Sequence, residues 1–173
     1  MSFTQINASV GKAYAPGYFL ASEECRRITY TADAENAAVK TAENGGKYLP
    51  MGTVYPANNG TAKGIIYEDV DVTSGDMPAS LVVEGTVYES RLPEAVDTYS
   101  SATVPTGGNP KTLGLYERSG TSPNYVYTLT TDTTAAENKT YYSYDGKKIA
   151  SAAKTALEAI GIKFVTEPTV TRP

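Results

Sequence analysis

The chain has 173 residues, of which 40% are hydrophobic and 20% are charged, and its formal charge is −4. This composition is typical of a folded domain with little electrostatic attraction to DNA or to an anionic membrane, so we expect neither as a direct partner. The chain has no histidine, which excludes Ser-His and Cys-His catalytic pairs and histidine metal sites. Its one cysteine, Cys25, forms neither an internal disulfide nor a cysteine zinc site. No stretch approaches the ~20 apolar residues of a membrane span, and the N-terminus lacks the features of a signal peptide, so we expect synthesis in the cytoplasm without export by that route.

The beginning of the chain, residues 1–20, shows no sustained periodicity, and Gly11, Pro16 and Gly17 interrupt any regular element. We therefore expect an extended N-terminal arm over these residues. Apolar side chains are spaced along it, and such anchors on an extended segment favour the addition of a strand to an exposed sheet edge of a partner. These candidate partner-binding residues are Phe3, Ile6, Val10, Tyr14, Tyr18 and Phe19.

Short apolar runs between turn residues predict a β-rich fold for residues 21–98. One strand is predicted over residues 65–72. The clearest strand is predicted over residues 79–89, where alternation places Leu81 and Val87 on the same face.

A change of composition marks the middle of the chain. Residues 99–109 have the character of a linker, and three tyrosine-rich runs follow, separated by turn residues. We expect these runs to form an inserted three-stranded antiparallel β module over residues 106–145.

The segment from Lys147 to Gly161 holds the one convincing helix, because its apolar residues recur every three or four positions and the glycine can end it. A last strand, IKFV, follows. The apolar partners that the helix needs lie before residue 93, so we expect a discontinuous domain of residues 21–98 and 147–173 that carries the module as an insertion. The alternative is two domains in series. The predicted fold class is mainly β (α+β), with one C-terminal helix.

Four acidic residues, Glu68, Asp69, Asp71 and Asp76, lie close together in the sequence and raise the question of a metal or catalytic site. A calcium loop that starts at Asp69 would carry serine both where glycine is required and where a bidentate glutamate is required. A glycosidase pair needs two acids across a cleft, whereas these are neighbours on a strand and a turn. We expect strand-edge and turn residues, and we predict no metal site, no cofactor and no catalytic residues.

Tyrosine is the commonest aromatic residue, with 14 copies against three phenylalanines and no tryptophan. Because aromatic faces can stack on sugars, one interpretation is a carbohydrate-binding or adhesion face for a host-surface glycan. Its candidate residues are Tyr116, Tyr125, Tyr127, Tyr141 and Tyr142. The interpretation that we favour is that these rings form the small core of the module.

Residues 62–93 carry the pattern Gly-Ile-Ile-Tyr-x-Asp-Val-Asp, which starts at Gly64, followed by a small turn and a strand that ends at Gly85. This order of features resembles the head decoration proteins of tailed phages, the lambda-type capsid cement proteins. The segment AAKTALEAIGIKFV is similar to the C-terminal helix and strand of related phage head proteins. Residues 106–145 are similar to a small β module of phage head and tail proteins, which the typical lambda-type protein lacks.

The resemblance implies a small β-barrel or β-tulip-like decoration domain that binds the outer surface of the virion capsid as a homotrimer, with the major capsid protein as its partner. It also implies that the N-terminal arm pairs with a strand of the capsid protein. Such a protein is structural and not an enzyme, and it stabilises the expanded, DNA-filled head. The role of the inserted module stays open between display, adhesion to the host surface and extra contacts between neighbouring copies.

Overall fold

The computed structural model describes residues 15–168, and the chain divides into two units that are described separately. The first unit comprises the described residues up to Val96 and from Lys148 onward, and the second comprises Asp97–Lys147. Strands account for 44% of the residues and one α-helix lies near the C-terminal end of the described part, which confirms the predicted mainly β, α+β class. The sheets do not close into a barrel, which corrects the barrel that the resemblance implied.

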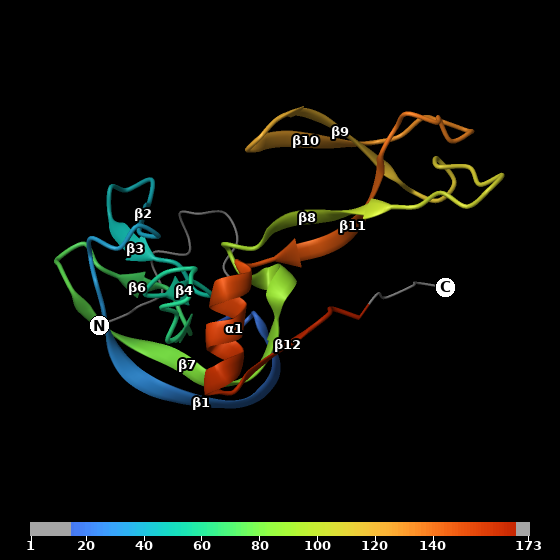
Figure 1. Ribbon diagram of the computed structural model, residues 1–173. Helices are drawn as coiled ribbons and strands as arrows, with labels where there is room; N and C mark the ends of the chain where they lie inside the picture. The colour runs from blue at the N-terminus through green and yellow to red at the C-terminus, as the bar shows by residue number, and fades with distance from the viewer. Residues whose placement is uncertain (1–14, 169–173) are drawn as a thin grey trace. The chain divides into compact units, whose positions relative to one another are not determined.

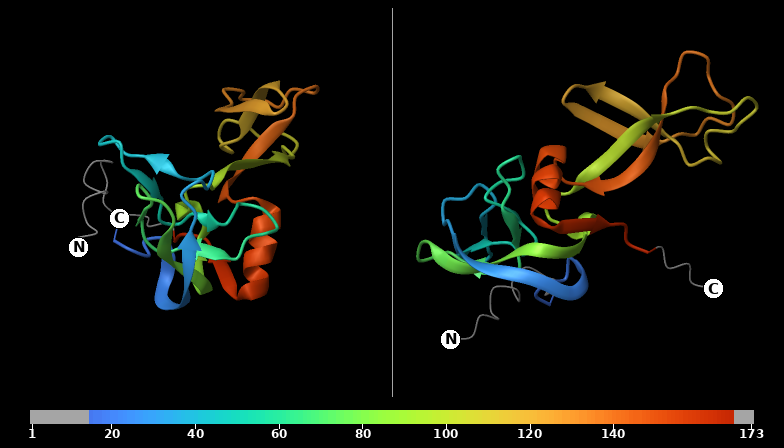
Figure 2. Two further views of the ribbon diagram at one scale, coloured as in Figure 1. Left: turned by 90° about the vertical axis from the view of Figure 1, so that its left-hand side faces the viewer. Right: turned by 60° about the horizontal axis from the view of Figure 1, so that its bottom comes forward.

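Strand β7 (Met77–Tyr88) is the centre of the first unit's five-stranded sheet (Figure 1). β1 (Leu20–Ala32) pairs with it antiparallel along one side, and Figure 2 shows the two strands side by side. Along the other side lie β5 (Gly64–Ile66), which is antiparallel, and β12 (Ile162–Val165), which is parallel. β4 (Val54–Tyr55) pairs with β5 and ends the sheet, so the outer strands, β1, β4 and β12, leave it open.

A three-stranded sheet of β2 (Lys40–Thr41), β3 (Lys47–Leu49) and β6 (Val70–Asp71) completes the strands of the first unit. The single strand predicted over residues 65–72 is therefore divided between two sheets. The chain bends between β5 and β6, where the Asp69 carboxylate accepts a hydrogen bond from the Met51 N–H at 2.6 Å.

Apolar side chains pack on both faces of β7, so its residues contribute to two core clusters. On one face, Val82 and Ile65 pack in a cluster with Leu157 of α1 (Ser151–Ile160). A second cluster occupies the opposite face and includes Leu49, Ile66, Val70 and Leu81. The helix thus covers one side of the sheet, and the small sheet contributes to the core on the other side.

The start of α1 is fixed by Glu89, in the short 3-10 turn η2 (Glu89–Arg91) that follows β7. This glutamate is only 8% exposed; its Oε1 accepts a hydrogen bond from the Ile149 N–H at 3.0 Å, and its Oε2 pairs with Lys154 Nζ at 2.7 Å. At the other end, Gly161 adopts a left-handed conformation with φ +117° and ends the helix, as the sequence predicted.

We expect Glu89→Ala to lower the free energy of unfolding of the first unit by about 2–3 kcal/mol, because it leaves the buried Ile149 N–H and the Lys154 ammonium without their acceptor. Denaturant unfolding followed by the helix signal in circular dichroism measures this loss. The matched control is Glu84→Ala, which removes an exposed ion pair to Arg26 and should cost less than about 1 kcal/mol. Equal losses in the two variants would contradict the role of Glu89.

The pairing of β1 with β7 is interrupted near Gly85, which has a φ of +150° that favours glycine. Leu20 lies opposite Val87 and Cys25 lies opposite Gly85, so four residues of β1 bulge out across from a single residue of β7. A second register shift, between Arg26 and Arg27, leaves Val83 of β7 without a partner on β1 and breaks the alternation of β7. Val87 packs in the cluster with α1 whereas Leu81 packs in the other cluster, so the predicted shared face of these two residues is wrong.

The sheet of the second unit has four strands in the order β10 (Asn124–Leu129), β9 (Tyr116–Thr121), β11 (Tyr141–Lys148) and β8 (Val96–Ala102). The prediction of three strands is therefore corrected. Residues 99–102, for which the composition predicts a linker, form the end of β8 and give β11 its second neighbour.

Candidate functional site

The described chain enters the first unit through an anchor at residues 15–20. The Gly17 N–H donates to the Tyr67 carbonyl at 2.9 Å, and the Leu20 N–H donates to the Gly17 carbonyl at 2.8 Å. Gly17 has a φ of +75° and lies so close to the Tyr67 ring that an added Cβ would sit 2.7 Å from it. Glycine is therefore needed at this turn, and the anchor is an integral part of the folded unit.

Arg91 ties the anchor to the segment that follows β12. Its guanidinium lies over the rings of Tyr18 and Tyr88, at 4.5 and 4.4 Å from their centroids, and donates to the Tyr18 carbonyl at 2.8 Å. The same guanidinium forms an ion pair with the Glu167 carboxylate, to which its Nε donates at 2.7 Å. One side chain thus holds two segments that are far apart in the sequence.

The six residues predicted for the arm differ in where they lie: one is buried, one is exposed and four lie outside the described residues. Phe19 is 1% exposed and packs in the cluster with α1, so it belongs to the core and not to a partner-binding arm. Tyr18 is 39% exposed and lies under Arg91. The remaining four arm residues, Phe3, Ile6, Val10 and Tyr14, lie outside the described residues.

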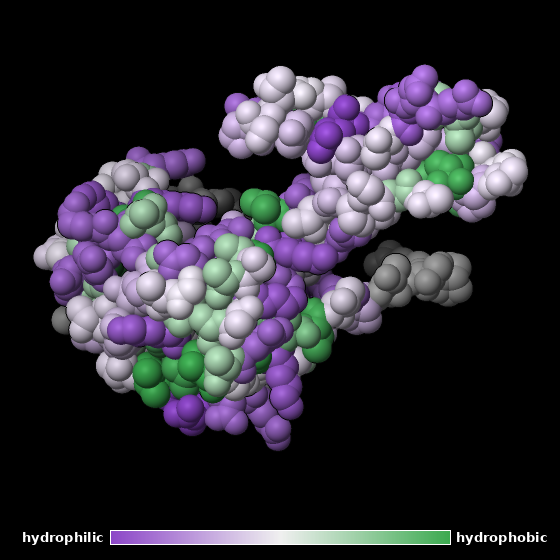
Figure 3. Space-filling view, viewed as in Figure 1, coloured by the Kyte–Doolittle hydropathy of each residue, from purple (hydrophilic) through white to green (hydrophobic). Residues whose placement is uncertain are grey.

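β1 follows the anchor and is an outer strand of the large sheet, with no strand paired beyond it in the part of the chain that the structure describes. Most of its side chains are exposed, including Ile28 at 41%. Figure 3 shows apolar side chains gathered over β1 and β7 with hydrophilic ones directly beside them. An outer strand presents backbone N–H and C=O groups to which another strand can add.

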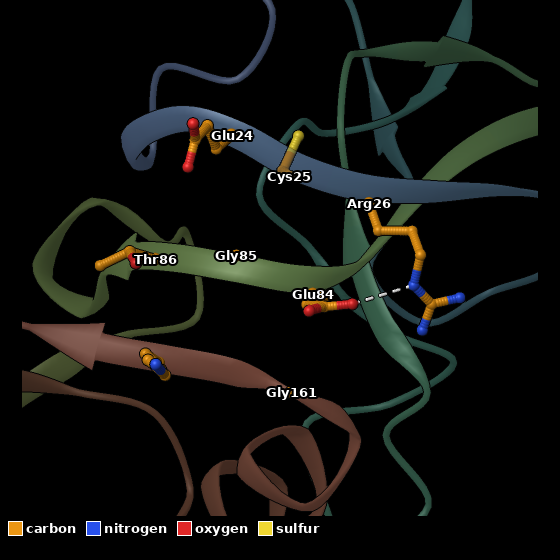
Figure 4. Close-up of a pocket in the computed structure, with 8 residues that line it drawn as sticks. Glu24, Cys25, Arg26, Glu84, Gly85, Thr86 and Gly161 are labelled. Carbon is orange, nitrogen blue, oxygen red and sulfur yellow. Dashed lines mark hydrogen bonds and ion pairs between the residues drawn. The ribbon is translucent and has the colours of Figure 1, made fainter.

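The bulge of β1 leaves a shallow pocket of about 400 Å³ above Gly85. Arg26 and Glu84 pair at one end of it at 3.0 Å, and Glu24 and Thr86 lie at the other end (Figure 4). The half-buried thiol of the free cysteine, Cys25, lines the pocket between them. Lys163 of β12 also lines the pocket, and the pocket's arginine is paired with a carboxylate.

The four clustered acids include three that bind the backbone. Asp69 accepts the N–H bond at the bend after β5, and Asp76 Oδ1 accepts a bond at 2.9 Å from a backbone N–H in the loop after β1. Asp71 Oδ1 accepts a bond from the Thr73 N–H at 2.9 Å, and the hydrogen bonds from Thr73 lower the pKa of Asp71. Glu68 is exposed. These are strand-edge and turn contacts, the roles that the sequence favoured.

The tyrosines of the second unit pack against one another. Tyr99 of β8 stacks on Tyr127 of β10, with ring centroids 4.0 Å apart and planes 7° apart. Tyr116 meets Tyr99 edge-on at 5.1 Å, and Tyr142 meets Tyr127 edge-on at 5.3 Å. Because β8 and β10 are the two outer strands and neighbouring strands lie about 4.8 Å apart, the sheet must curl strongly to bring these rings together. The rings form the core of the unit.

The structure corrects the predicted adhesion face. Tyr141 and Tyr142 are only 3% and 7% exposed, and Tyr116 and Tyr127 are half-buried within the stack. Tyr125 alone of the five candidates is exposed, at 39%. Ring faces that contact one another are not available to a sugar, so the structure supports the interpretation of these tyrosines as core.

A charged network holds the loop between β10 and β11. Lys139 Nζ bonds to Glu117 Oε1 and to Asp132 Oδ2, both at 2.9 Å, and the Tyr141 hydroxyl donates to Asp132 at 2.6 Å. The hydrogen bonds from Tyr141 and then Lys139 lower the pKa of Asp132, and those from the Thr130 hydroxyl and Lys139 lower the pKa of Glu117. The same bonds raise the pKa of Lys139 and of Tyr141.

We expect the carboxyls of Asp132 and Glu117 to titrate below their ordinary pKa values in NMR, and Lys139→Met to raise both. Because the folded pKa values are lowered, the network's contribution to stability is complete above the unfolded pKa values and is lost as the pH falls through the folded ones. The network should therefore hold the loop between β10 and β11 in place at neutral and mildly acidic pH. Ordinary pKa values in the wild type would contradict the network.

Among residues 15–168, no group of three or more side chains of metal-binding type is arranged to hold an ion. Nor does the described chain include a helix of the length and apolar character that crossing a membrane requires. Comparison of the chain with protein-family models, with curated proteins and with solved structures gives no match.

Proposed function

We propose that the chain is a structural, non-enzymatic virion protein that binds the outer surface of a tailed-phage capsid as a decoration, or cement, protein. It clamps neighbouring copies of the major capsid protein and stabilises the expanded, DNA-filled head, as a homotrimer of the kind that the resemblance implies. The observation that carries the proposal is the anchor at residues 15–20, which joins the N-terminal arm to an exposed outer strand, β1.

The pattern that resembles that of decoration proteins has a scaffolding role in this fold. Gly64 lies so close to β7 that an added Cβ would sit 2.5 Å from the Val82 carbonyl oxygen. Ile65 and Ile66 are fully buried in the clusters on opposite faces of the sheet, and the Tyr67 carbonyl receives the anchor. A pattern that builds the sheet and holds the anchor suits a protein that presents a binding segment.

The anchor gives the arm a fixed point on its own protein. A clamp needs such a point, because binding of the arm restrains the capsid only if the arm is firmly attached to a folded body. Gly17 and Phe19 supply the attachment through the backbone bond to Tyr67 and through burial in the core. The apolar residues of the arm would then supply the side-chain contacts of strand addition, while the backbone supplies the hydrogen bonds.

A protein that binds the expanded shell and not its precursor stabilises the expanded state by mass action, in proportion to the logarithm of its concentration over its dissociation constant. The proposal is tested by co-sedimentation of the full chain with purified expanded capsids of the phage that encodes it. We expect saturable binding and a higher temperature of capsid disruption. A chain that stays in the supernatant at all concentrations would overturn the proposal.

A further inference from the structure

β10 is an outer strand of the second unit and pairs only with β9 among the described strands. Its sequence, NYVYTL, contains no charge, no proline and no glycine, and its register with β9 is regular over all six residues. Outer strands of soluble proteins are usually protected by charges, prolines or bulges. β1 carries two register irregularities and several charged residues, whereas β10 has none of these devices.

The hydrogen bonds of the hairpin indicate which backbone groups of β10 face outward. The Thr130 N–H donates to the Leu115 carbonyl at 2.9 Å, one step beyond the paired residues Leu129 and Tyr116. Bonded and non-bonded pairs alternate in an antiparallel ladder, so the even-numbered residues of β10 direct their backbone groups toward β9. The odd-numbered residues, with Tyr127 at their centre, direct theirs toward the open edge, where the Tyr125 N–H already donates to the Pro123 carbonyl at 3.1 Å.

We propose that β10 pairs antiparallel with β10 of a second copy of this chain, about a two-fold axis at Tyr127. A symmetric pair needs outward-directed residues opposite one another, and this register places Tyr127 opposite its own counterpart. It also places Tyr125 opposite Leu129 and Val126 opposite Thr128 of the second copy. These uncharged aromatic, aliphatic and β-branched pairs stabilise a sheet, and the two four-stranded sheets become one continuous sheet.

The exposed side chains of β10 suit a second copy as the occupant. Val126 is 57% exposed, Leu129 is 61% exposed and Tyr125 is 39% exposed, and each gains an opposing side chain in the pair. A charged strand of another protein would find no complementary charge on β10, whereas a second β10 offers the same uncharged row. In the two-fold pair each β10 covers the open edge of the other. The pairing through β10 therefore ends at two copies. The inference goes beyond the proposed function and does not depend on it.

The test is analytical ultracentrifugation of the full chain over a range of concentrations, with two double variants. Val126 and Thr128 are both exposed and lie on the face of β10 opposite to that of Tyr127, so their replacement should leave the tyrosine core intact. We expect a concentration-dependent pairing of the wild type, seen as a doubling of mass that is separate from any trimer. V126K/T128K opposes lysine to lysine twice and should abolish the association, whereas V126K/T128E opposes lysine to glutamate twice and should retain it.

Each outcome of the test decides the proposal. A wild type without this doubling of mass, or a doubling that persists in V126K/T128K, would overturn it, and loss in both variants would exclude the proposed register. Hydrogen exchange of the wild type gives a second measurement that needs no variant. The amides of Tyr127 and Leu129 should become protected as the concentration rises, and fast exchange of both at every concentration would equally overturn the pairing.

Discussion

Phe19→Ala should lower the free energy of unfolding of the first unit by about 3–5 kcal/mol, the loss typical of removing a buried aromatic ring. Phe19 is 1% exposed and packs in the cluster with α1, and its carbonyl accepts a hydrogen bond from the Tyr88 N–H at 2.8 Å. Since domains are stable by only about 5–15 kcal/mol, this single change removes a large part of the total.

The neighbouring residue supplies the matched control for this variant. Tyr18→Ala removes a half-exposed ring that Arg91 overlies, and it should cost only about 1 kcal/mol. The one α-helix of the described chain belongs to the first unit, so its circular-dichroism signal in denaturant reports the unfolding of that unit. A Phe19→Ala variant as stable as Tyr18→Ala would show that Phe19 is not part of the core.

The elements with a strong local pattern could be predicted from the sequence. The amphipathic period of α1 and the glycine at its end located the helix, and Ala153 and Leu157 of its apolar face are fully buried. The alternation and the β-branched content of residues 79–89 located β7, and the tyrosine-rich runs located β9, β10 and β11. In each case the residues of the element itself carry the signal.

Features that depend on contacts distant in the sequence could not be predicted. The register shift that leaves Val83 of β7 without a partner places Val87 on the face opposite to that of Leu81, and it depends on how β1 registers with β7. Phe19 lies in a turn without periodicity, so its sequence surroundings resembled those of an arm residue. The ion pair of Arg91 with Glu167 joins residues 76 positions apart, and no spacing rule indicates it.

The tyrosine cluster shows the same limit in the second unit. Tyr99 stood in a segment with the composition of a linker, and it was not among the candidate residues, yet it stacks on Tyr127 at the centre of the cluster. The sequence predicted that the rings would be either a core or a binding face. Only the curling of the sheet, which brings the two outer strands together, decides between them.

Deletion of residues 2–14 should abolish binding to the capsid while leaving both units folded. The deletion stops before the anchor, so it retains the Gly17 bond to Tyr67, the buried Phe19 and the contacts of Arg91 with Tyr18. It removes the arm residues that can supply strand addition. A variant of full length, with serine in place of Phe3, Ile6 and Val10, separates the loss of these apolar contacts from the loss of chain length.

The central claim is tested most directly by co-sedimentation of these three proteins with expanded capsids, after circular dichroism has shown that all of them are folded. The account predicts that the wild type sediments with the capsids, that the deletion stays in the supernatant and that the serine variant binds far more weakly than the wild type. Equal occupancy of the capsid by the wild type and by the deletion would contradict it.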